Sequence, residues 1–153
     1  MKNGQNPAKS NALRYAILFT LIGLVGVETP HAIADDGSIV VITSILTPSK
    51  TLTREQVADI FLGRIPPGER WKPIDNNEES LRQQFYQSTA NLSSNRARAV
   101  WSSLVFANRA IPPREMSSEQ ATLVVAKEPF SITYVFNRRV PKDVKVLLSL
   151  PAP

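Results

Sequence analysis

The spacing of apolar and polar positions predicts three strands and one short extended segment. Residues 38–46, SIVVITSIL, are β-branched and almost continuously apolar, which is typical of a strand buried on both faces. Residues 131–137, SITYVFN, alternate and are rich in strand-forming residues, and residues 144–150, VKVLLSL, predict a final strand. The short extended segment is expected at residues 71–74, WKPI.

The first helix is predicted from its end signals and its apolar stripe. Thr53 is expected to be the N-cap, and Gln56 three residues later completes a capping box. Gly63 is the expected C-terminal stop. The buried stripe would consist of Val57, Ile60 and Phe61.

The second helix is expected over residues 78–90, with Asn76 or Asn77 as its cap. Leu81 and Phe85 have i,i+4 spacing and would share the buried face. The sequence leaves open whether Tyr86 or Gln84 lies beside them.

Two further helices follow. The third would begin near Ser93 or Ser94, and its apolar positions repeat at helical spacing, which predicts one buried face. That face comprises Ala97, Val100, Trp101, Leu104 and Val105, and Phe106 is also expected in the core. The fourth helix, over residues 118–128, has a capping box from Ser117 and Gln120 and ends before Pro129.

This order of elements defines an α/β class, a mixed sheet with helices packed on it in one domain. Residues 64–71, RIPPGERW, and 108–115, NRAIPPRE, are expected to be loops because proline and glycine prevent regular structure there. Arg138 and Arg139 follow a strand, so they could meet a ligand at the carboxyl edge of the sheet. We interpret them instead as an ordinary polar turn.

The N-terminus has the pattern of a cleavable Sec-type signal peptide. An apolar run of 13 residues, 15–27, follows a basic segment, and small residues precede a cleavage site after Ala34. An uncleaved anchor is the alternative, but a membrane span needs about 20 apolar residues. We therefore expect a signal peptide at 1–34, a periplasmic domain at 35–153, and no stable membrane insertion after cleavage.

Composition removes several classes of chemistry. The chain has no cysteine, and its one histidine, His31, lies in the expected signal peptide. Histidine-dependent nucleophilic catalysis and the usual zinc sites are therefore excluded from the mature domain. Residues 35–153 carry a net charge of +3, which does not demand a nucleic acid partner. We expect no enzyme, no cofactor and no metal.

One cluster of carboxylates could in principle act as an acid–base site. Asp75, Glu78 and Glu79 lie within one turn, and paired carboxylates can catalyse proton transfer when burial separates their pKa values. The stretch is polar throughout and gives no indication of burial, so catalysis is not expected.

Several segments together resemble a known family. They are LTREQVADIFLGR at 52–64, SLRQQFY at 80–86, ARAVWSSLVFANRAIPPRE at 97–115, and SITYVFN. The chain resembles small periplasmic proteins related to the phosphate-binding component of phosphate ABC transporters. The resemblance implies one lobe of a type 2 periplasmic-binding, Venus-flytrap fold. A two-lobed binder needs roughly 250 residues, whereas 119 would remain here after residue 34.

The resemblance also implies a ligand loop. Phosphate binders of this family carry an Arg, an Asp and a Ser-Gly-Thr at the start of the helix that matches the second helix here. In this sequence the stretch reads DNNEESLRQQ, so the Ser-Gly-Thr is absent. Asp75 would replace the hydrogen-bond acceptor. The expected oxyanion ligands are Ser80, Arg82, Asn76 and Asn77, together with Thr43 and Ser44 after the first strand.

Glu78 and Glu79 stand where an anion would meet the helix start, and they would oppose its binding by a few kcal/mol. The first hypothesis is a solute-binding-like protein that binds phosphate or another small oxyanion weakly and works with an ABC transporter permease. The second is an envelope interaction module that kept the fold and lost solute binding. An exposed apolar patch around Trp71, Ile65 and Pro66 would support it.

Overall fold

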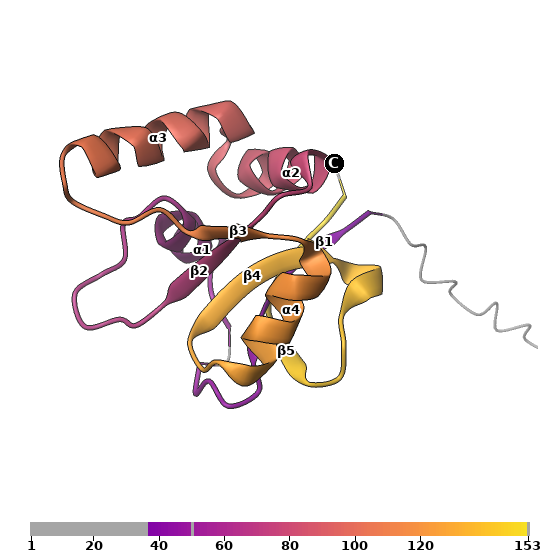
Figure 1. Ribbon diagram of the computed structural model, residues 1–153. Coiled ribbons are helices and arrows are strands. Elements are labelled where there is room, and N and C mark those ends of the chain that lie inside the picture. Colours follow the sequence, from indigo (N-terminus) through magenta and orange to yellow (C-terminus); the bar gives the residue numbers. More distant parts are fainter. Residues whose placement is uncertain (1–36, 50, 153) are drawn as a thin grey trace, which may run out of the picture. The chain divides into compact units, whose positions relative to one another are not determined.

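The β-branched and alternating segments of the sequence form one five-stranded mixed sheet in the computed structural model, which describes residues 37–49 and 51–152. The expected signal peptide and its cleavage site lie outside the described residues. The strands are β1 (Ile39–Ser44), β2 (Lys72–Asn76), β3 (Arg114–Met116), β4 (Ser131–Phe136) and β5 (Val144–Leu150). Their order across the sheet is β3-β2-β4-β1-β5 (Figure 1).

Strand direction decides which side chains meet at each edge of the sheet. β2 runs parallel to both β3 and β4, whereas β1 is antiparallel to β4 and β5. The carboxyl ends of β2, β3 and β4 therefore share one edge, and the carboxyl end of β1 lies at the opposite edge. β3 is a correction to the sequence prediction, because the first two of its three residues lie in the segment expected to be a loop, residues 108–115.

Helices cover both faces of the sheet. They are α1 (Arg54–Phe61), α2 (Glu79–Ala90), α3 (Ser94–Phe106) and α4 (Ser118–Lys127), and a 3-10 turn, η1 (Asn137–Arg139), follows β4. Alternate residues of β1 point to opposite faces. Ile39 and Val41 pack in the cluster formed with α1 and α2, whereas Val40 and Ile42 pack against α4. This two-sided burial explains why β1 is almost continuously apolar.

Aromatic side chains fill the larger core cluster. The rings of Phe85 and Tyr134 are stacked, with centroids 3.7 Å apart and planes within 2°. Phe61 contacts both rings edge-on, at 4.8 and 5.4 Å. Tyr86, rather than Gln84, joins Leu81 and Phe85 on the buried face of α2.

The predicted ends of α1 and α4 are confirmed. Thr53 with Gln56 and Ser117 with Gln120 form complete capping boxes. Gly63 follows α1 with a φ of +73°, a backbone conformation that residues with a Cβ rarely adopt. α3 begins at Ser94, with Ser93 as the N-cap whose hydroxyl accepts from the amide of Arg96.

The predicted cap of α2 is wrong. Glu78 is the N-cap residue, and its side chain makes no capping hydrogen bond. Asn76 belongs to β2 and pairs with Met116 of β3. The Oδ1 atom of Asn76 accepts a hydrogen bond from the Glu78 amide at 2.9 Å. The amide of Asn77 donates to the Met116 carbonyl. Because Asn76 is paired with β3 and Asn77 is hydrogen-bonded to it, α2 begins only after both residues, at Glu79.

The apolar face of α3 is only half covered. Ala97 and Trp101 are buried, but Val105 is 47% exposed and Phe106 is 96% exposed. The expectation that Phe106 lies in the core is wrong. α3 packs mainly against α2 rather than on the sheet (Figure 1), and Val105 and Phe106 in its last turn remain exposed. None of the helices within the described ranges is long and apolar enough to span a bilayer.

Candidate functional site

The shared carboxyl edge of β2, β3 and β4 brings three chain reversals together. The chain enters α2 after β2, enters α4 after β3, and enters η1 after β4. Open α/β sheets bind ligands outside the carboxyl ends of their parallel strands, so this edge is the first candidate site. We call it the carboxyl-edge site, formed by residues 76–80, 117–119 and 137–139.

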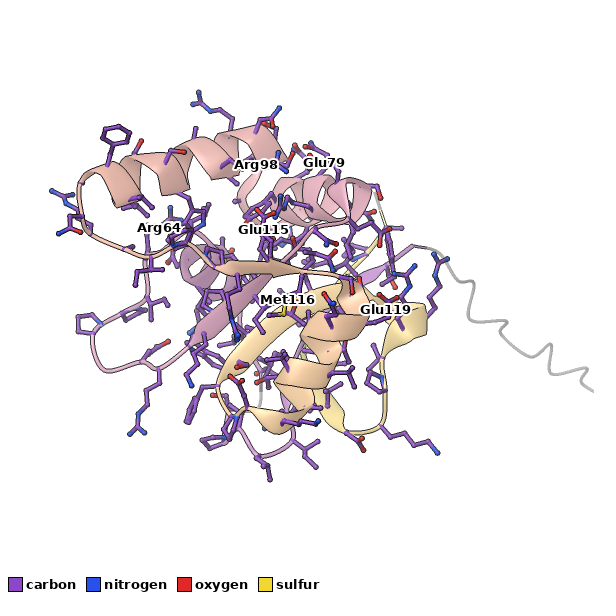
Figure 2. The ribbon with its side chains drawn as sticks, viewed as in Figure 1. Arg64, Glu79, Arg98, Glu115, Met116 and Glu119 are labelled. Atoms are coloured by element: carbon purple, nitrogen blue, oxygen red, sulfur yellow. The ribbon has the colours of Figure 1, made fainter. Side chains whose placement is uncertain are left out.

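A carboxylate of the chain lies between two donors of this site. Glu78 Oε2 accepts from Arg139 Nη1 at 3.2 Å, and Glu78 Oε1 accepts from the Ser80 hydroxyl at 3.4 Å. Arg139 Nη1 also lies 3.7 Å from Oε1 of Glu119, a residue at the start of α4. Glu119 is labelled in Figure 2. These side chains are at least a third exposed, so the ion pairs are partly solvated.

Arg139 is the residue of this site that sequence reasoning passed over. The chain places it 61 residues from Glu78, and only the pairing of β2 with β4 brings the two strand ends together. The signal was the position of the arginine directly after a strand that ends at the ligand edge. Arg138 and Arg139 do form a turn, η1, directly after β4.

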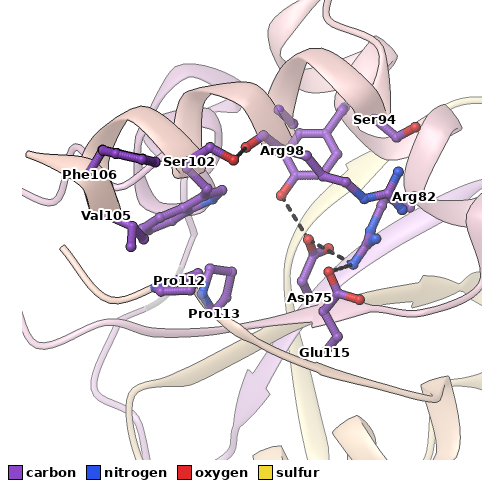
Figure 3. Close-up of a pocket in the computed structure, with 13 residues that line it drawn as sticks. Asp75, Arg82, Ser94, Arg98, Ser102, Val105, Phe106, Pro112, Pro113 and Glu115 are labelled. Atoms are coloured by element: carbon purple, nitrogen blue, oxygen red, sulfur yellow. Dashed lines mark hydrogen bonds and ion pairs between the residues drawn. The ribbon is translucent and has the colours of Figure 1, made fainter.

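Arg82, an expected anion ligand, is instead buried beneath the helix. Its side chain is 2% exposed, and Nη2 lies 3.2 Å from Asp75 Oδ2 and 2.6 Å from Glu115 Oε1 (Figure 3). Burial opposes the charged form of the guanidinium, but the neighbouring Asp75 and Glu115 carboxylates outweigh it and raise the pKa of Arg82. The arginine points into the protein because residue 82 lies three and four positions before Phe85 and Tyr86, on the buried face of α2.

Asp75 is also buried, which corrects the expectation of a solvated polar loop. Its carboxylate accepts from the hydroxyl of Tyr86 at 3.1 Å and from the hydroxyl of Tyr134. Burial first, and then the Asp75 charge, raise the pKa of both tyrosines. Asp75 lies in β2, a central strand, so its polar neighbours in the sequence did not reveal its position.

The remaining predicted ligands divide between the two edges of the sheet. Asn77 and Ser80 are exposed at the carboxyl-edge site, whereas Asn76 is buried and donates from Nδ2 to the Ser118 hydroxyl at 2.8 Å. Thr43 and Ser44 lie at the far edge, where the Thr43 hydroxyl donates to the Ser131 carbonyl at 2.7 Å. The Ser44 hydroxyl donates to the Ala126 carbonyl at 3.3 Å.

The strand register separates Thr43 from the other predicted ligands. Thr43 pairs with Ile132, which pairs in turn with Pro73, three residues before Asn76. Strand spacing and rise place Thr43 and Asn76 about 14 Å apart, too far for one small anion to contact both. Ser80 and Arg139 meet at the Glu78 carboxylate, next to Asn77 in the chain, and the structure does not bring Thr43 or Ser44 to them.

Of the apolar patch expected around Trp71, Pro66 is exposed and Ile65 is partly exposed, but Trp71 itself is buried. Trp71 is only 8% exposed and packs edge-on against Phe130, with ring centroids 6.2 Å apart. Three large exposed apolar side chains, Val105, Phe106 and Ile111, lie at and after the end of α3. Within the described ranges, no cluster of histidine and acidic side chains could hold a metal ion.

Comparison with solved structures places this architecture in a known fold. The chain is similar to a protein from Clostridium perfringens described as a phosphate ABC transporter substrate-binding protein with bound phosphate. The TM-score is 0.55 and the sequence identity 18%, over 72% of this chain and 44% of that chain. An ABC-type phosphate transport receptor from Vibrio cholerae matches with a TM-score of 0.46 and 15% identity, over 72% of this chain and 45% of the other.

The likeness to the Clostridium protein identifies the fold. The described domain is a single lobe of a periplasmic-binding fold, as expected, and the chain spans less than half the length of the solved proteins that it matches. No protein-family profile matches the chain, and no curated protein does.

Proposed function

We propose that this chain is a periplasmic, single-lobe solute-binding-like protein that binds phosphate or another small oxyanion weakly at its carboxyl-edge site. Ser80, Asn77 and Arg139 would donate to the anion, and Glu78 would compete with it. The observation that carries the proposal is the position of the Glu78 carboxylate, which lies between the Ser80 hydroxyl and the Arg139 guanidinium. Those two donors suit any oxyanion of similar size.

The competition accounts for weak binding. An anion that reaches Ser80 and Arg139 must displace the Glu78 carboxylate or lie beside it. Two unit charges about 5 Å apart repel by about 3 kcal/mol at an effective dielectric constant near 20. Glu119, 3.7 Å from the same guanidinium nitrogen, adds to the repulsion. The α2 N-terminus would otherwise favour an anion through its free amides.

The test is to remove the competing charge. Glu78→Gln keeps the side-chain size and should increase phosphate affinity at least tenfold, measured by titration calorimetry of residues 35–153 with phosphate and sulfate. Ser80→Ala and Arg139→Ala in the Glu78→Gln background should each remove most of that gain. Glu69→Gln, in the exposed loop before β2, is the matched control and should leave the affinity unchanged.

The proposal is wrong if the Glu78→Gln variant shows no phosphate or sulfate binding at tens of millimolar. It is also wrong if the variant binds but Arg139→Ala has no effect, because the anion would then lie elsewhere.

The location of the protein is part of the same proposal. Residues 1–34 would direct export and be removed after Ala34, leaving residues 35–153 in the periplasm. N-terminal sequencing of protein from an osmotic-shock fraction tests both points. A mature N-terminus at Asp35 agrees with the proposal, and an intact Met1 in the membrane fraction contradicts it. An ABC transporter permease would then be the partner that receives the anion.

One observation favours a second candidate function, the envelope interaction module. Val105, Phe106 and Ile111 expose apolar surface at one end of α3, in place of the expected patch at Trp71. A photoreactive amino acid at position 106 should crosslink to an envelope protein in cells. The matched control is position 123 on α4, since Leu123 is 63% exposed on another helix. Equal crosslinking at both positions would contradict this function.

A further inference from the structure

A cavity separate from the carboxyl-edge site lies between α3, α2 and the segment that leads into β3. Its volume is about 410 Å³, within the range of small-molecule sites. Figure 3 shows the chain after α3 returning beneath the helix, so that Pro112 and Pro113 face Val105 and Phe106 across the opening.

The walls of this cavity are mainly apolar. Trp101 and Val105 come from α3, and the two prolines form the opposite side. Trp101 is held in place because its Nε1–H donates to the Phe61 carbonyl at 2.9 Å. Prolines limit the backbone of the facing segment. The apolar surface is therefore attached to a rigid helix on one side and to a stiff segment on the other.

The buried guanidinium of Arg82 forms the floor of the cavity, and its Nε–H has no hydrogen-bond acceptor among the described residues. Arg82 lines the cavity with a side chain that is 2% exposed. Nε of Arg82 has no hydrogen-bond acceptor among the described residues, and the close contacts of Nη2 to Asp75 and Glu115 are not aligned as hydrogen bonds. Buried guanidinium donors are normally satisfied, so Nε indicates a missing acceptor, whereas Nη2 is already ion-paired with both carboxylates.

Glu115 occupies the side of Arg82 that faces the opening. Its side chain is 52% exposed, whereas the other carboxylate on Arg82, Asp75, is 8% exposed and is fixed by Tyr86 and Tyr134. Glu115 can therefore turn into solvent while Asp75 stays. A carboxylate that replaces Glu115 at Arg82 leaves the net charge at the floor unchanged, because one anion is exchanged for another.

We propose that this cavity binds a monocarboxylate with a small apolar body, such as an aromatic ring. The carboxylate would take the place of Glu115 on Arg82, since a guanidinium suits a carboxylate in a two-pronged geometry. The body would lie against Trp101, Val105 and the prolines. The ligand could be a free aromatic acid or the C-terminal residue of a peptide, because both present the same chemistry.

A dianion such as phosphate is not expected here. Asp75 remains at the floor when Glu115 moves away, so a monoanion leaves one negative charge in excess of Arg82, whereas a dianion would leave two. Arg98 also lines the cavity, but it is engaged by Glu79, with 2.6 Å between Nη2 and Oε2 (Figure 2). The inference is therefore independent of the proposed phosphate site, and the two can fail separately.

The experiment is a titration of residues 35–153 with phenylacetate, followed by the two tryptophan indole NH signals in ¹H–¹⁵N NMR spectra. The Trp101 signal should shift with saturation, and the Trp71 signal is the internal control because Trp71 lies outside the cavity. Phenylacetamide and phenethylamine should bind at least tenfold more weakly. Acetyl-phenylalanine and acetyl-Gly-Gly-Phe separate the two sources, since a peptide site should prefer the longer compound.

Two variants that spare the buried core make the test specific. Glu115→Gln should tighten phenylacetate binding at least threefold, because it removes the competing carboxylate. Val105→Ser should weaken binding at least threefold, and Leu123→Ser on α4 is its matched control, with no change expected.

Three results would overturn the proposal. They are no saturable Trp101 shift in any protein, equal affinity for phenylacetamide, and weaker binding after Glu115→Gln. Inorganic phosphate should leave the Trp101 signal unchanged, and a phosphate-dependent shift there would contradict the preference for a monoanion.

Discussion

Nη2 of Arg82 and Oδ2 of Asp75 lie 3.2 Å apart in the interior of the protein, joining helix α2 to strand β2. Both side chains were expected to face an anion at the start of the helix. Their pairing makes them part of the core instead, where Asp75 also accepts from Tyr86 and Tyr134. Arg82 therefore contributes to the stability of the lobe and lines the cavity between α2 and α3, and it is not part of the carboxyl-edge site.

Breaking this pair should destabilise the domain strongly. Asp75→Leu leaves a buried arginine with only Glu115 as a partner, and the free energy of unfolding should fall by about 3–5 kcal/mol. The measurement is urea unfolding followed by circular dichroism. The double variant Asp75→Leu with Arg82→Leu should recover part of the loss, because no uncompensated charge remains. A loss below about 1 kcal/mol in the single variant would contradict this account.

Gly63 should be difficult to replace for two separable reasons. Its φ is +73°, and an added Cβ would lie 2.8 Å from Leu104 Cδ1 and 2.9 Å from Trp101 Cη2. Gly63→Ala should therefore lower the free energy of unfolding by about 2–4 kcal/mol, from backbone strain and overpacking together.

Gly68 provides the matched control for this substitution. Its φ is +91°, but a Cβ there would meet nothing within 4 Å. Gly68→Ala should show the strain alone, about 1 kcal/mol. Equal losses in the two variants, measured by thermal unfolding, would show that the contact between Gly63 and α3 has no energetic consequence.

Two phenylalanines should differ sharply in their contribution to stability. Phe85 is fully buried and stacks on Tyr134, so Phe85→Ala should cost about 3–5 kcal/mol. Phe106 is 96% exposed, and Phe106→Ala should change the free energy of unfolding by no more than about 0.5 kcal/mol. Denaturant unfolding measures both. A large loss for Phe106→Ala would mean that the end of α3 is covered in solution.

Stability should decline in acid partly through Glu79. The Ser94 hydroxyl and then the Arg98 guanidinium donate to this carboxylate and lower the pKa of Glu79 in the folded state. A depressed folded pKa contributes stability above the unfolded value, near 4.5, which is lost as pH falls through the folded value. Glu79→Gln should therefore flatten the decline in melting temperature below about pH 4.5.

Ser94→Ala provides the companion test for Glu79. It removes the first of the two donors while leaving the carboxylate in place, so the decline in acid should become shallower but persist. If neither variant alters the pH dependence of the melting temperature between pH 5 and 3, the Ser94 contact does not hold the carboxylate ionised.

The sequence by itself determined the features that depend on local chemistry. Capping boxes at Thr53 and Ser117, the stop at Gly63, and the β-branched strand after residue 38 were all readable because each rests on residues within one turn or one strand. The apolar periods fixed the α/β class for the same reason. The family resemblance then pointed to a single lobe, and the structural comparison agrees with that fold.

Only the tertiary structure decided which polar residues meet. The antiparallel direction of β1 carried Thr43 to the edge opposite Asn77, and the pairing of β2 with β4 brought Arg139 to Glu78. Arg82 of α2 points inward to the buried Asp75 of β2. Phe106 is at the surface because α3 packs mainly against α2. These outcomes follow from strand direction and helix rotation, which are set by contacts between distant segments, so no local pattern of residues could specify them.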